Sequence, residues 1–420
     1  HEIMLEEAEH GNAYAMHDMG KIYAQGIGCE ADKEMADVWY KKALAAMQYV
    51  EQKKKNTYLE YRIGKMYQYG LGTDENLEQA AEWFFKAAVK EHKYALYSLG
   101  MLYLQGKGVE QDEETAYSLL FRSYSKGNPY AAYELGKLYE AGCGTEKNQE
   151  KSENCYRAAF LGFLNLEKKS KDDTLWYRIG CMYLHGIGTE ADETKAEHYL
   201  TKASDYGNTH ASYQLARLYI RQESQKLSGE SGTAPDYTKI AKAVKWLEES
   251  AAQENPFADY AIGRLYREGT LVAEDMEKAV FHLKRAADAG NSYAQYQLGK
   301  IYLEEDTRNI PAAIQYLTLA AKQKNEFAAY RLGKLYLTGE ELPKNTELAL
   351  HYLKMAADTG NQYAQYALGK VYLIGKDVQQ DKELAYDYFL KSAEQGNIYA
   401  AYFLEPWNDM PPPDLLLMAA

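Results

Sequence analysis

The stretch "YAQYALGKVY" at residues 363–372 returns with small changes along the whole chain. "YAQYQLGKIY" lies at 293–302, "FAAYRLGKLY" at 327–336 and "YALYSLGMLY" at 94–103. Repetition at a fixed period is typical of proteins in which each unit packs only on its neighbours. The 420 residues therefore need not divide into two or three globular domains.

Each copy of this stretch can be indexed on its glycine, and most consecutive copies are 36 residues apart. A unit of that size is typical of a helix–turn–helix solenoid repeat. An eleventh copy, "YAAYFLEPW", begins near the end and breaks off. The ten indexing positions, the sixth of which is alanine, are Gly20, Gly64, Gly100, Gly136, Gly180, Ala216, Gly263, Gly299, Gly333 and Gly369.

Residues 94–127 illustrate one unit. Apolar residues of "YALYSLGMLYLQG" fall at helical spacing and predict a first amphipathic helix. The turn "GKGVEQD" ends in an Asp that is a typical N-cap for the second helix, which a Gly-Asn pair is expected to terminate. The caps recur at Asp32, Asn76, Asp112, Asn148, Asp192, Asp275, Asn345 and Asp381, and the Gly-Asn pair at Gly127, Gly207, Gly290, Gly360 and Gly396.

The recurring glycines have a structural interpretation. A glycine inside a helix costs about 1 kcal/mol relative to alanine, so its recurrence predicts that the two helices approach too closely there for a side chain. Gly-x-Gly pairs such as Gly106/Gly108 and Gly186/Gly188 resemble parts of phosphate-binding loops. Such loops follow a strand, whereas these follow a predicted helix, so we interpret them as turns.

The stretch "YSLGMLYLQGKGVEQDEETAYSLL" resembles a Sel1-like repeat, as do "ADVWYKKALA" (36–45) and "AAEWFFKAAV" (80–89) in their aromatic–Lys–Ala pattern. The resemblance covers residues 1–405. It implies an all-α fold, an α/α superhelical solenoid of about ten Sel1-like helix–turn–helix repeats related to tetratricopeptide arrays. It also implies a protein–protein interaction scaffold or adaptor, with no catalytic residues to carry over.

We expect a repeat array over 1–405 and a tail over 406–420. The chain starts at His1 without an initiator Met and looks like a fragment, so its first residues are expected to be the second helix of a truncated repeat. The Ser- and Gly-rich stretch 221–239 predicts a mobile loop between helices. The Pro-rich tail either caps the last repeat or begins a truncated following segment.

Two units carry eight extra residues, in "AMQYVEQKKKNTYLEYRIG" (46–64) and "FLGFLNLEKKSKDDTLWYRIG" (160–180). Eight residues amount to about two helical turns. We interpret them as longer second helices that change the curvature of the array. The alternative is a ridge that binds a partner.

Composition argues against several classes of function. The net charge of -13 opposes a main role in binding nucleic acid or an anionic membrane, and no stretch of about 18 apolar residues predicts a membrane span. The four Cys and nine His show no metal-ligand spacing. No nucleophile–base pair or phosphate loop appears either. We therefore expect no cofactor, no metal, no catalysis, and free thiols in a reducing, cytoplasmic setting.

Two sets of tyrosines recur at fixed distances from the indexing position. The Tyr three residues after it lies on the side that the hairpin buries, and it is present in all ten units. A second face holds the positions six and three before the index and those one and four after it. Those positions carry aromatic residues and, in eight of ten units, a Lys or Arg one turn beyond a Tyr or His.

In tetratricopeptide-like arrays the second face lines the concave groove, and the resemblance implies the same here. The cations either lie over the tyrosine rings or form a basic, aromatic stripe suited to a peptide with acidic and aromatic side chains. The stripe also suits single-stranded nucleic acid, which the overall charge opposes. Its candidate residues are Tyr260, Arg264, Tyr293, Tyr296, Lys300, Phe327, Tyr330, Lys334, Tyr363, Tyr366 and Lys370.

Two other functions compete with a docking scaffold. The C-terminal repeats also resemble arrays appended to relaxases (mobilisation proteins) of Gram-positive mobile elements, which implies an accessory role beside a missing DNA-nicking domain. Alternatively, exposed ends of the array stack on one another and drive self-assembly.

Overall fold

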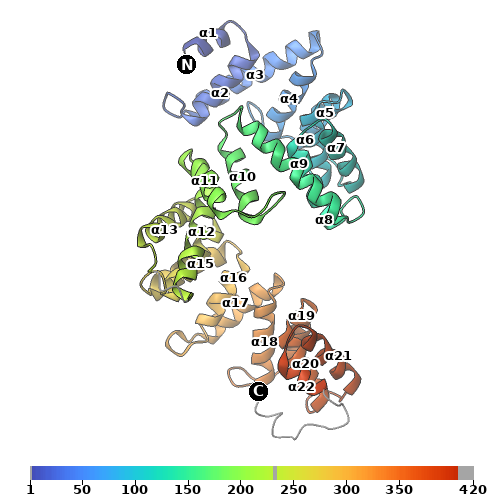
Figure 1. Ribbon diagram of the computed structural model, residues 1–420, viewed down its shortest axis with the longest axis vertical. Helices are drawn as coiled ribbons and strands as arrows, with labels where there is room; N and C mark the ends of the chain where they lie inside the picture. The colour runs from blue at the N-terminus through green and yellow to red at the C-terminus, as the bar shows by residue number, and fades with distance from the viewer. Residues whose placement is uncertain (1, 230–233, 405–420) are drawn as a thin grey trace. The chain divides into compact units, whose positions relative to one another are not determined.

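A computed structural model describes residues 2–229 and 234–404. Over these ranges the chain forms 22 α-helices, one short 3-10 helix and no strand (Figure 1). The elements are α1 (Glu2–Glu9), α2 (Ala13–Gln25), α3 (Lys33–Lys53), α4 (Thr57–Tyr69), α5 (Leu77–Val89), α6 (Lys93–Gln105), α7 (Glu113–Ser125), α8 (Pro129–Ala141), α9 (Gln149–Glu167), α10 (Asp173–His185), α11 (Glu193–Asp205), α12 (Thr209–Ser228), α13 (Tyr237–Ala252), α14 (Pro256–Glu268), α15 (Met276–Asp288), α16 (Ser292–Ile301), η1 (Glu305–Thr307), α17 (Ile310–Lys322), α18 (Glu326–Thr338), α19 (Thr346–Asp358), α20 (Gln362–Ile374), α21 (Lys382–Glu394) and α22 (Ile398–Leu404).

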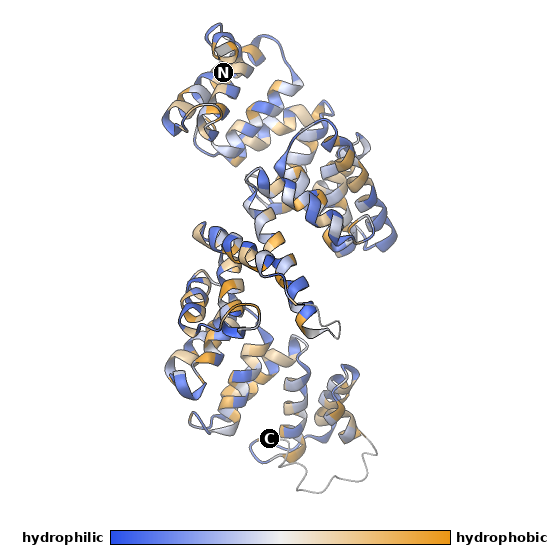
Figure 2. Cartoon of the chain, turned by 60° about the vertical axis from the view of Figure 1, so that its left-hand side comes forward, coloured by the Kyte–Doolittle hydropathy of each residue, from blue (hydrophilic) through white to orange (hydrophobic). Residues whose placement is uncertain are grey.

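The helices pair in chain order. From α2 to α20, each even-numbered helix packs most closely on the odd-numbered helix that follows it. We call α2, α4 and so on to α20 the first helices, and α3, α5 and so on to α21 the second helices. The all-α fold of helix–turn–helix repeats is thereby confirmed. Orange and blue residues alternate along several ribbons in Figure 2, as expected for helices with an apolar and a polar side.

The chain divides into two compact units, an N-terminal unit (His1–Asn208) and a C-terminal unit (Thr209–Ala420). In each unit the core consists mainly of Ala and Leu side chains from both helices of successive hairpins. In the C-terminal unit, for example, Leu332, Leu353 and Leu368 are fully buried together. Within the described part of the chain, no helix is both long and apolar enough for a membrane span.

The predicted caps are confirmed at the start of the second helices. The side chain of Asp112 accepts a hydrogen bond from the Thr115 backbone N–H at 2.9 Å, and the other seven predicted Asp and Asn residues cap their helices in the same way. The Gly-Asn pair has two roles. Gly127 adopts a left-handed φ of 75°, and Asn128 caps the next first helix rather than ending the previous one.

The predicted close approach at the indexing glycine is also confirmed. A Cβ built on Gly333 lies 2.6 Å from Cγ of Leu353, and one built on Gly64 lies 2.6 Å from the Phe84 ring. Real Cβ atoms do not come this close to another heavy atom. The first and second helices therefore meet in contact with the glycine backbone.

The Tyr three residues after the index was expected in the hairpin core, and the structure places it at the edge of that core. Only Tyr139 and Tyr219 are buried, and the other eight are half-buried. Several stack on a Tyr of the second helix, as Tyr336 does on Tyr352 with ring centroids 6.1 Å apart. The ring therefore covers the hairpin from the solvent side.

Both long units contain longer second helices, as predicted. Helix α3 has 21 residues and α9 has 19, against 13 in regular second helices such as α5 and α7. Their effect on curvature and their use as a partner-binding ridge stay predictions.

The mobile loop expected over 221–239 is wrong for most of its length. Helix α12 continues to Ser228, and α13 begins at Tyr237. The continuation is explained by Glu223, which is fully buried, accepts hydrogen bonds from Lys226 at 2.9 Å and accepts another from the Asp236 backbone N–H at 2.7 Å. The composition of the stretch could not predict this contact, because it joins residues that are 13 positions apart. Residues 230–233 and the tail 406–420 lie outside the described residues.

Candidate functional site

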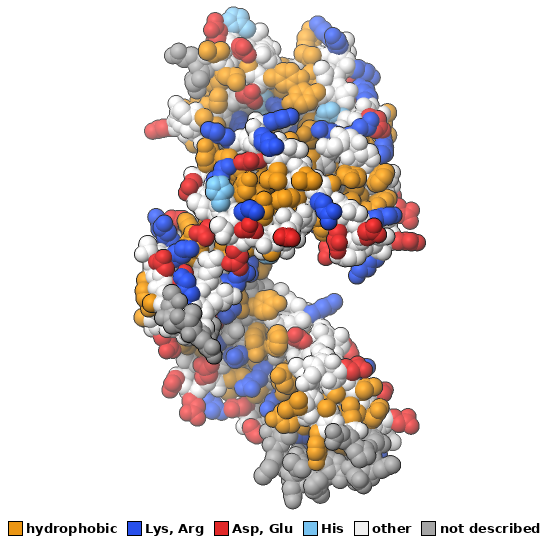
Figure 3. All heavy atoms as spheres, in the orientation of Figure 1, with side chains coloured by type: hydrophobic (Ala, Val, Ile, Leu, Met, Phe, Trp, Pro, Cys, Tyr) orange, Lys and Arg blue, Asp and Glu red, His pale blue; other side chains and the backbone are white. Residues whose placement is uncertain are grey.

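The eleven residues of the predicted stripe lie on four consecutive first helices of the C-terminal unit: α14, α16, α18 and α20. We call the side of these helices that carries them the first-helix face. It contains three aligned positions in each helix: six before, three before and one after the indexing glycine. In Figure 3 hydrophobic, basic and acidic side chains share the visible surface of this unit, in the lower half of the view.

The aromatic residue six before the index is exposed in every one of these helices. Phe257, Tyr293, Phe327 and Tyr363 expose between 44% and 58% of their surface. The Tyr three before the index, in contrast, is half-buried in all four helices. The face therefore has an outer row of accessible rings and an inner row of rings that are partly packed.

The two rows touch across the junction between repeats. Tyr260 contacts Tyr293 with ring centroids 6.1 Å apart, Tyr296 contacts Phe327 at 5.9 Å, and Tyr330 contacts Tyr363 at 6.1 Å. In all three pairs the rings are tilted by 36–39°. Because these separations lie within the range of about 4.5–7 Å for attractive aromatic pairs, the inner tyrosines link neighbouring repeats. That part of the motif is structural.

The cations lie over the inner rings of their own helices in three of the four units. The distance to the ring centroid is 6.0 Å for Arg264 over Tyr260, 5.8 Å for Lys300 over Tyr296 and 5.7 Å for Lys370 over Tyr366. Arg264 is also held by Glu268, one helical turn further along α14, at 2.5 Å. Within the described chain Lys300 and Lys334 have no carboxylate within ion-pair distance.

A pocket of about 480 Å³ lies between α18 and α20. Tyr330, Lys334, Tyr366 and Lys370 line it, together with an apolar floor of Leu337, Leu353, Val371 and Ile374. Burial, and then the charge of Lys334, lower the pKa of Lys370. Lys376, Glu340 and Asp377 also line the pocket, and Asp377 pairs with Lys344 at 2.7 Å. The pocket thus combines apolar surface with charged side chains, among which Lys334 and Lys370 are close enough to repel one another.

A second pocket, of about 500 Å³, lies between α12 and α14. Three of the predicted residues, Tyr260, Arg264 and Tyr293, line it. Arg217 and Arg221 of α12 add two further cations at its wall, and Glu268 adds one carboxylate. The structure therefore brings seven of the eleven predicted residues into two pockets, both on first helices.

The structure also adds residues that the sequence interpretation missed. The positive charge of Arg331, two residues before the index, acts on both Tyr296 and Tyr330. Arg331 is exposed and belongs to the same face. The apolar floor at Leu337 and Ile374 was missed as well. The sequence predicts where these residues lie around the helix axis. Only the contacts between repeats show that they line this pocket.

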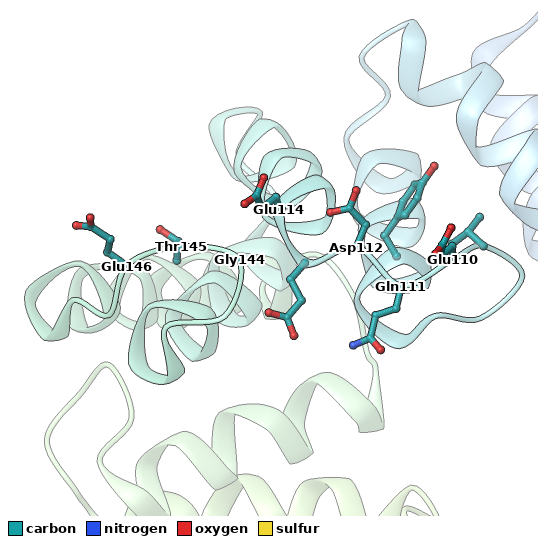
Figure 4. A pocket seen from close by; sticks show the side chains of 10 residues that line it. Glu110, Gln111, Asp112, Glu114, Gly144, Thr145 and Glu146 are labelled. Carbon is teal, nitrogen blue, oxygen red and sulfur yellow. The ribbon is translucent and has the colours of Figure 1, made fainter.

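Another pocket, of about 1160 Å³, lies between two turns of the N-terminal unit. Figure 4 shows carboxylates of Glu110, Asp112, Glu114 and Glu146 around it, pointing in different directions. Asp112 is already engaged as a helix cap. Over the described ranges no group of three or more His, Cys, Asp or Glu residues is arranged to hold a metal ion. We assign no site to this hollow.

The repeat pattern and the hairpin geometry match a known family. A family model described as Sel1 repeat matches ten stretches of the chain, at residues 13–46, 58–89, 93–128, 129–161, 177–208, 209–255, 256–291, 292–325, 327–361 and 362–397. The chain belongs to the Sel1 repeat family. Proteins with Sel1 repeats generally mediate protein–protein interactions and are generally not enzymes.

Two solved structures are similar to this chain. The Sel1 repeat protein from Oxalobacter formigenes is 26% identical, with a TM-score of 0.51, over 78% of this chain and 90% of that chain. The protein c5321, a protective antigen present in uropathogenic Escherichia coli strains, is 25% identical, with a TM-score of 0.48, over 96% of this chain and 88% of that one. A search of curated proteins found no match. The comparisons give no support to the weaker resemblance to relaxase-appended arrays.

Proposed function

We propose that this Sel1 repeat protein is a non-enzymatic scaffold that docks a partner protein on the first-helix face of its C-terminal unit. The observation that carries the proposal is the pocket between α18 and α20, where an apolar floor is bordered by Lys334 and Lys370. An apolar side chain of a partner fits the floor. A carboxylate beside it relieves the repulsion between the two lysines.

The exposed outer rings extend this surface along the unit. Tyr293, Phe327 and Tyr363 present accessible aromatic area at consecutive repeats. Rings of this kind are common energetic anchors of interfaces, whereas the surrounding cations set specificity and association rate. The partner segment we propose is therefore acidic and aromatic. An acidic segment has the same sign as the protein's net charge of -13, so its attraction to the protein depends on the local cations of this face.

The test is a quantitative pull-down with the variant Lys300→Glu/Lys334→Glu/Lys370→Glu. The matched control is Lys242→Glu/Lys322→Glu/Lys382→Glu, which changes three exposed lysines on second helices by the same charge. Circular dichroism first establishes that both variants are as helical as wild type. We expect one partner to be lost from the first variant and retained by the control.

Two outcomes contradict the proposal. If both variants retain the same partners, the Tyr–Lys pattern serves packing alone. If instead the wild type binds single-stranded nucleic acid with a steep salt dependence that the first variant abolishes, the face is a nucleic-acid surface. A second variant, Tyr293→Ala/Phe327→Ala/Tyr363→Ala, tests the aromatic anchors without removing buried side chains.

A further inference from the structure

Two arginines of the N-terminal unit stand apart from all other arginines in the described residues. Nε of Arg62, on α4, and Nε of Arg178, on α10, are buried without any hydrogen-bond partner. Neither guanidinium has a carboxylate within ion-pair distance among the described residues, whereas Arg122, Arg267 and others do. A buried polar group normally has a partner, so these two require an explanation.

The two arginines occupy equivalent places. Each stands two residues before the indexing glycine, in the first helix that follows one of the two long second helices, α3 and α9. Their charges act on the same two positions of the preceding first helix. These are the residues six and three before the index: Tyr14 and His17 for Arg62, and Tyr130 and Tyr133 for Arg178.

Aromatic rings rather than acids surround each guanidinium. Cζ of Arg178 lies 5.4 Å from the Tyr130 ring centroid, and Cζ of Arg62 lies 6.0 Å from that of Tyr58. The nearby carboxylates are already engaged: Glu134 pairs with Lys137 at 2.6 Å, Asp172 caps α10, and Asp18 lies 3.4 Å from His17. These contacts hold the guanidinium in place. Because Nε is buried, a carboxylate from outside reaches each half-buried arginine through its terminal nitrogens.

We propose that Arg178 and Arg62 are carboxylate-binding residues for an acidic peptide segment of a partner protein, which runs along the first helices of the N-terminal unit. A guanidinium has five N–H donors in a planar fork that matches a carboxylate. The neighbouring tyrosines supply flat surfaces for the peptide on either side. Since the site lies in the other unit, it does not depend on the function proposed for the C-terminal unit.

The test uses the full chain and a fluorescently labelled, acetylated and amidated peptide of alternating Glu and Ser, with its Gln–Ser counterpart as the neutral probe. Fluorescence anisotropy measures binding in the background of Lys300→Glu/Lys334→Glu/Lys370→Glu, so that the C-terminal face does not contribute. We expect Arg178→Gln to weaken binding of the Glu peptide about tenfold, as for loss of a charge-assisted, two-point contact. Arg62→Gln should weaken it as well.

The matched control is Arg157→Gln, which removes an exposed arginine of α9 in the same unit. It should leave the affinity unchanged. An equal loss in both variants indicates a nonspecific charge effect and overturns the proposal. So does equal affinity of the starting protein for the Glu and Gln peptides.

Thermal unfolding distinguishes binding from a structural role. Because the guanidinium is unpaired, Arg178→Met should leave the melting temperature unchanged or raise it. A clear decrease would mean that Arg178 mainly packs the repeat junction, and it would overturn the proposal. Arg178→Lys provides the last check, since it retains the charge without the fork and should bind as weakly as Arg178→Gln.

Discussion

At the scale of single residues, two backbone constraints recur through the array. The indexing glycine has helical geometry and lies against the second helix, so the space beside it is limiting. The residue before the first-helix cap has a left-handed φ in all described units except those of α4 and α10, so its backbone conformation is limiting there. The same amino acid is thus favoured for two different reasons at the two positions.

The substitution Gly333→Ala tests whether the space between the indexing glycine and the second helix is limiting. Its Cβ would lie 2.6 Å from Cγ and 2.8 Å from Cδ2 of Leu353. Overpacking of this kind costs about 1–3 kcal/mol, which should lower the midpoint of urea unfolding. In the double variant Gly333→Ala/Leu353→Ala, the loss should be smaller than the sum of the single losses. Additive losses would show that the two residues do not compete for space.

The substitution Lys324→Gly tests whether the left-handed backbone conformation before a first-helix cap is limiting. Lys324 has a φ of 62° at the position where other units have glycine, as at Gly290 and Gly360. Glycine reaches this region without a steric penalty, so the substitution should stabilise the protein by about 0.5–1 kcal/mol. The control Gln323→Gly, at a φ of -88°, should destabilise it instead. Equal midpoints of urea unfolding for both variants would contradict the argument.

At the scale of elements, helix length depends on what the end of the helix contacts. Most second helices have 13 residues and end where a left-handed residue turns the chain, as α7 does at Gly127. Among the first helices, α12 has 20 residues, whereas α14 has 13. It extends to Ser228 because the carboxylate of Glu223 accepts a hydrogen bond from the backbone N–H of Asp236, the residue that caps α13.

Glu223→Ala should therefore loosen the end of α12. The change leaves Lys226 and the Asp236 N–H without their buried acceptor, a loss of about 1–3 kcal/mol. Hydrogen exchange followed by mass spectrometry should show faster exchange in peptides covering the last two turns of α12. Glu249→Ala removes an exposed glutamate of α13 and should leave exchange unchanged. Unchanged exchange in Glu223→Ala would show that the helix continues without this contact.

At the scale of the whole molecule, burial of many tyrosines makes stability depend on alkaline pH. Burial raises the pKa of Tyr61 and Tyr97 to about 12, against 10.0 without burial. A pKa raised in the folded state means that stability is fully present below pH 10 and is lost as the pH rises toward 12. Unfolding followed by circular dichroism should therefore occur in that window.

The variants Tyr61→Phe and Tyr97→Phe should each move this alkaline midpoint upward, because phenylalanine does not ionise. Tyr237→Phe, at an exposed ring, should leave it unchanged. A midpoint that none of the three variants moves would assign alkaline unfolding to other groups.

The division into two units predicts independent local stability. In arrays of this kind each repeat contacts only its neighbours, so a defect acts over short range. Gly333→Ala should accelerate hydrogen exchange in α18 and α19 and leave the N-terminal unit unchanged. Faster exchange throughout His1–Asn208 would instead show that the two units unfold together.

The sequence by itself determined the repeat, its helices and its caps. These features depend on local signals, such as apolar spacing, Asp and Asn before a helix, and glycine after it, and each signal acts within a few residues. Helical spacing also predicted the first-helix face, because the positions six and three before the index and one after it lie on one side of a helix. Whether that face binds a partner stays a prediction.

Only the tertiary structure decided where the polar groups find partners. The buried contact of Glu223 with Asp236, the apolar floor at Leu337 and Ile374, and the unpaired guanidiniums of Arg62 and Arg178 all depend on residues from different helices. Local composition carries no information about such pairs, because the energy of a buried charge depends on what surrounds it in space. That is why the loop predicted over 221–239 was wrong for most of its length and the two arginines were not found.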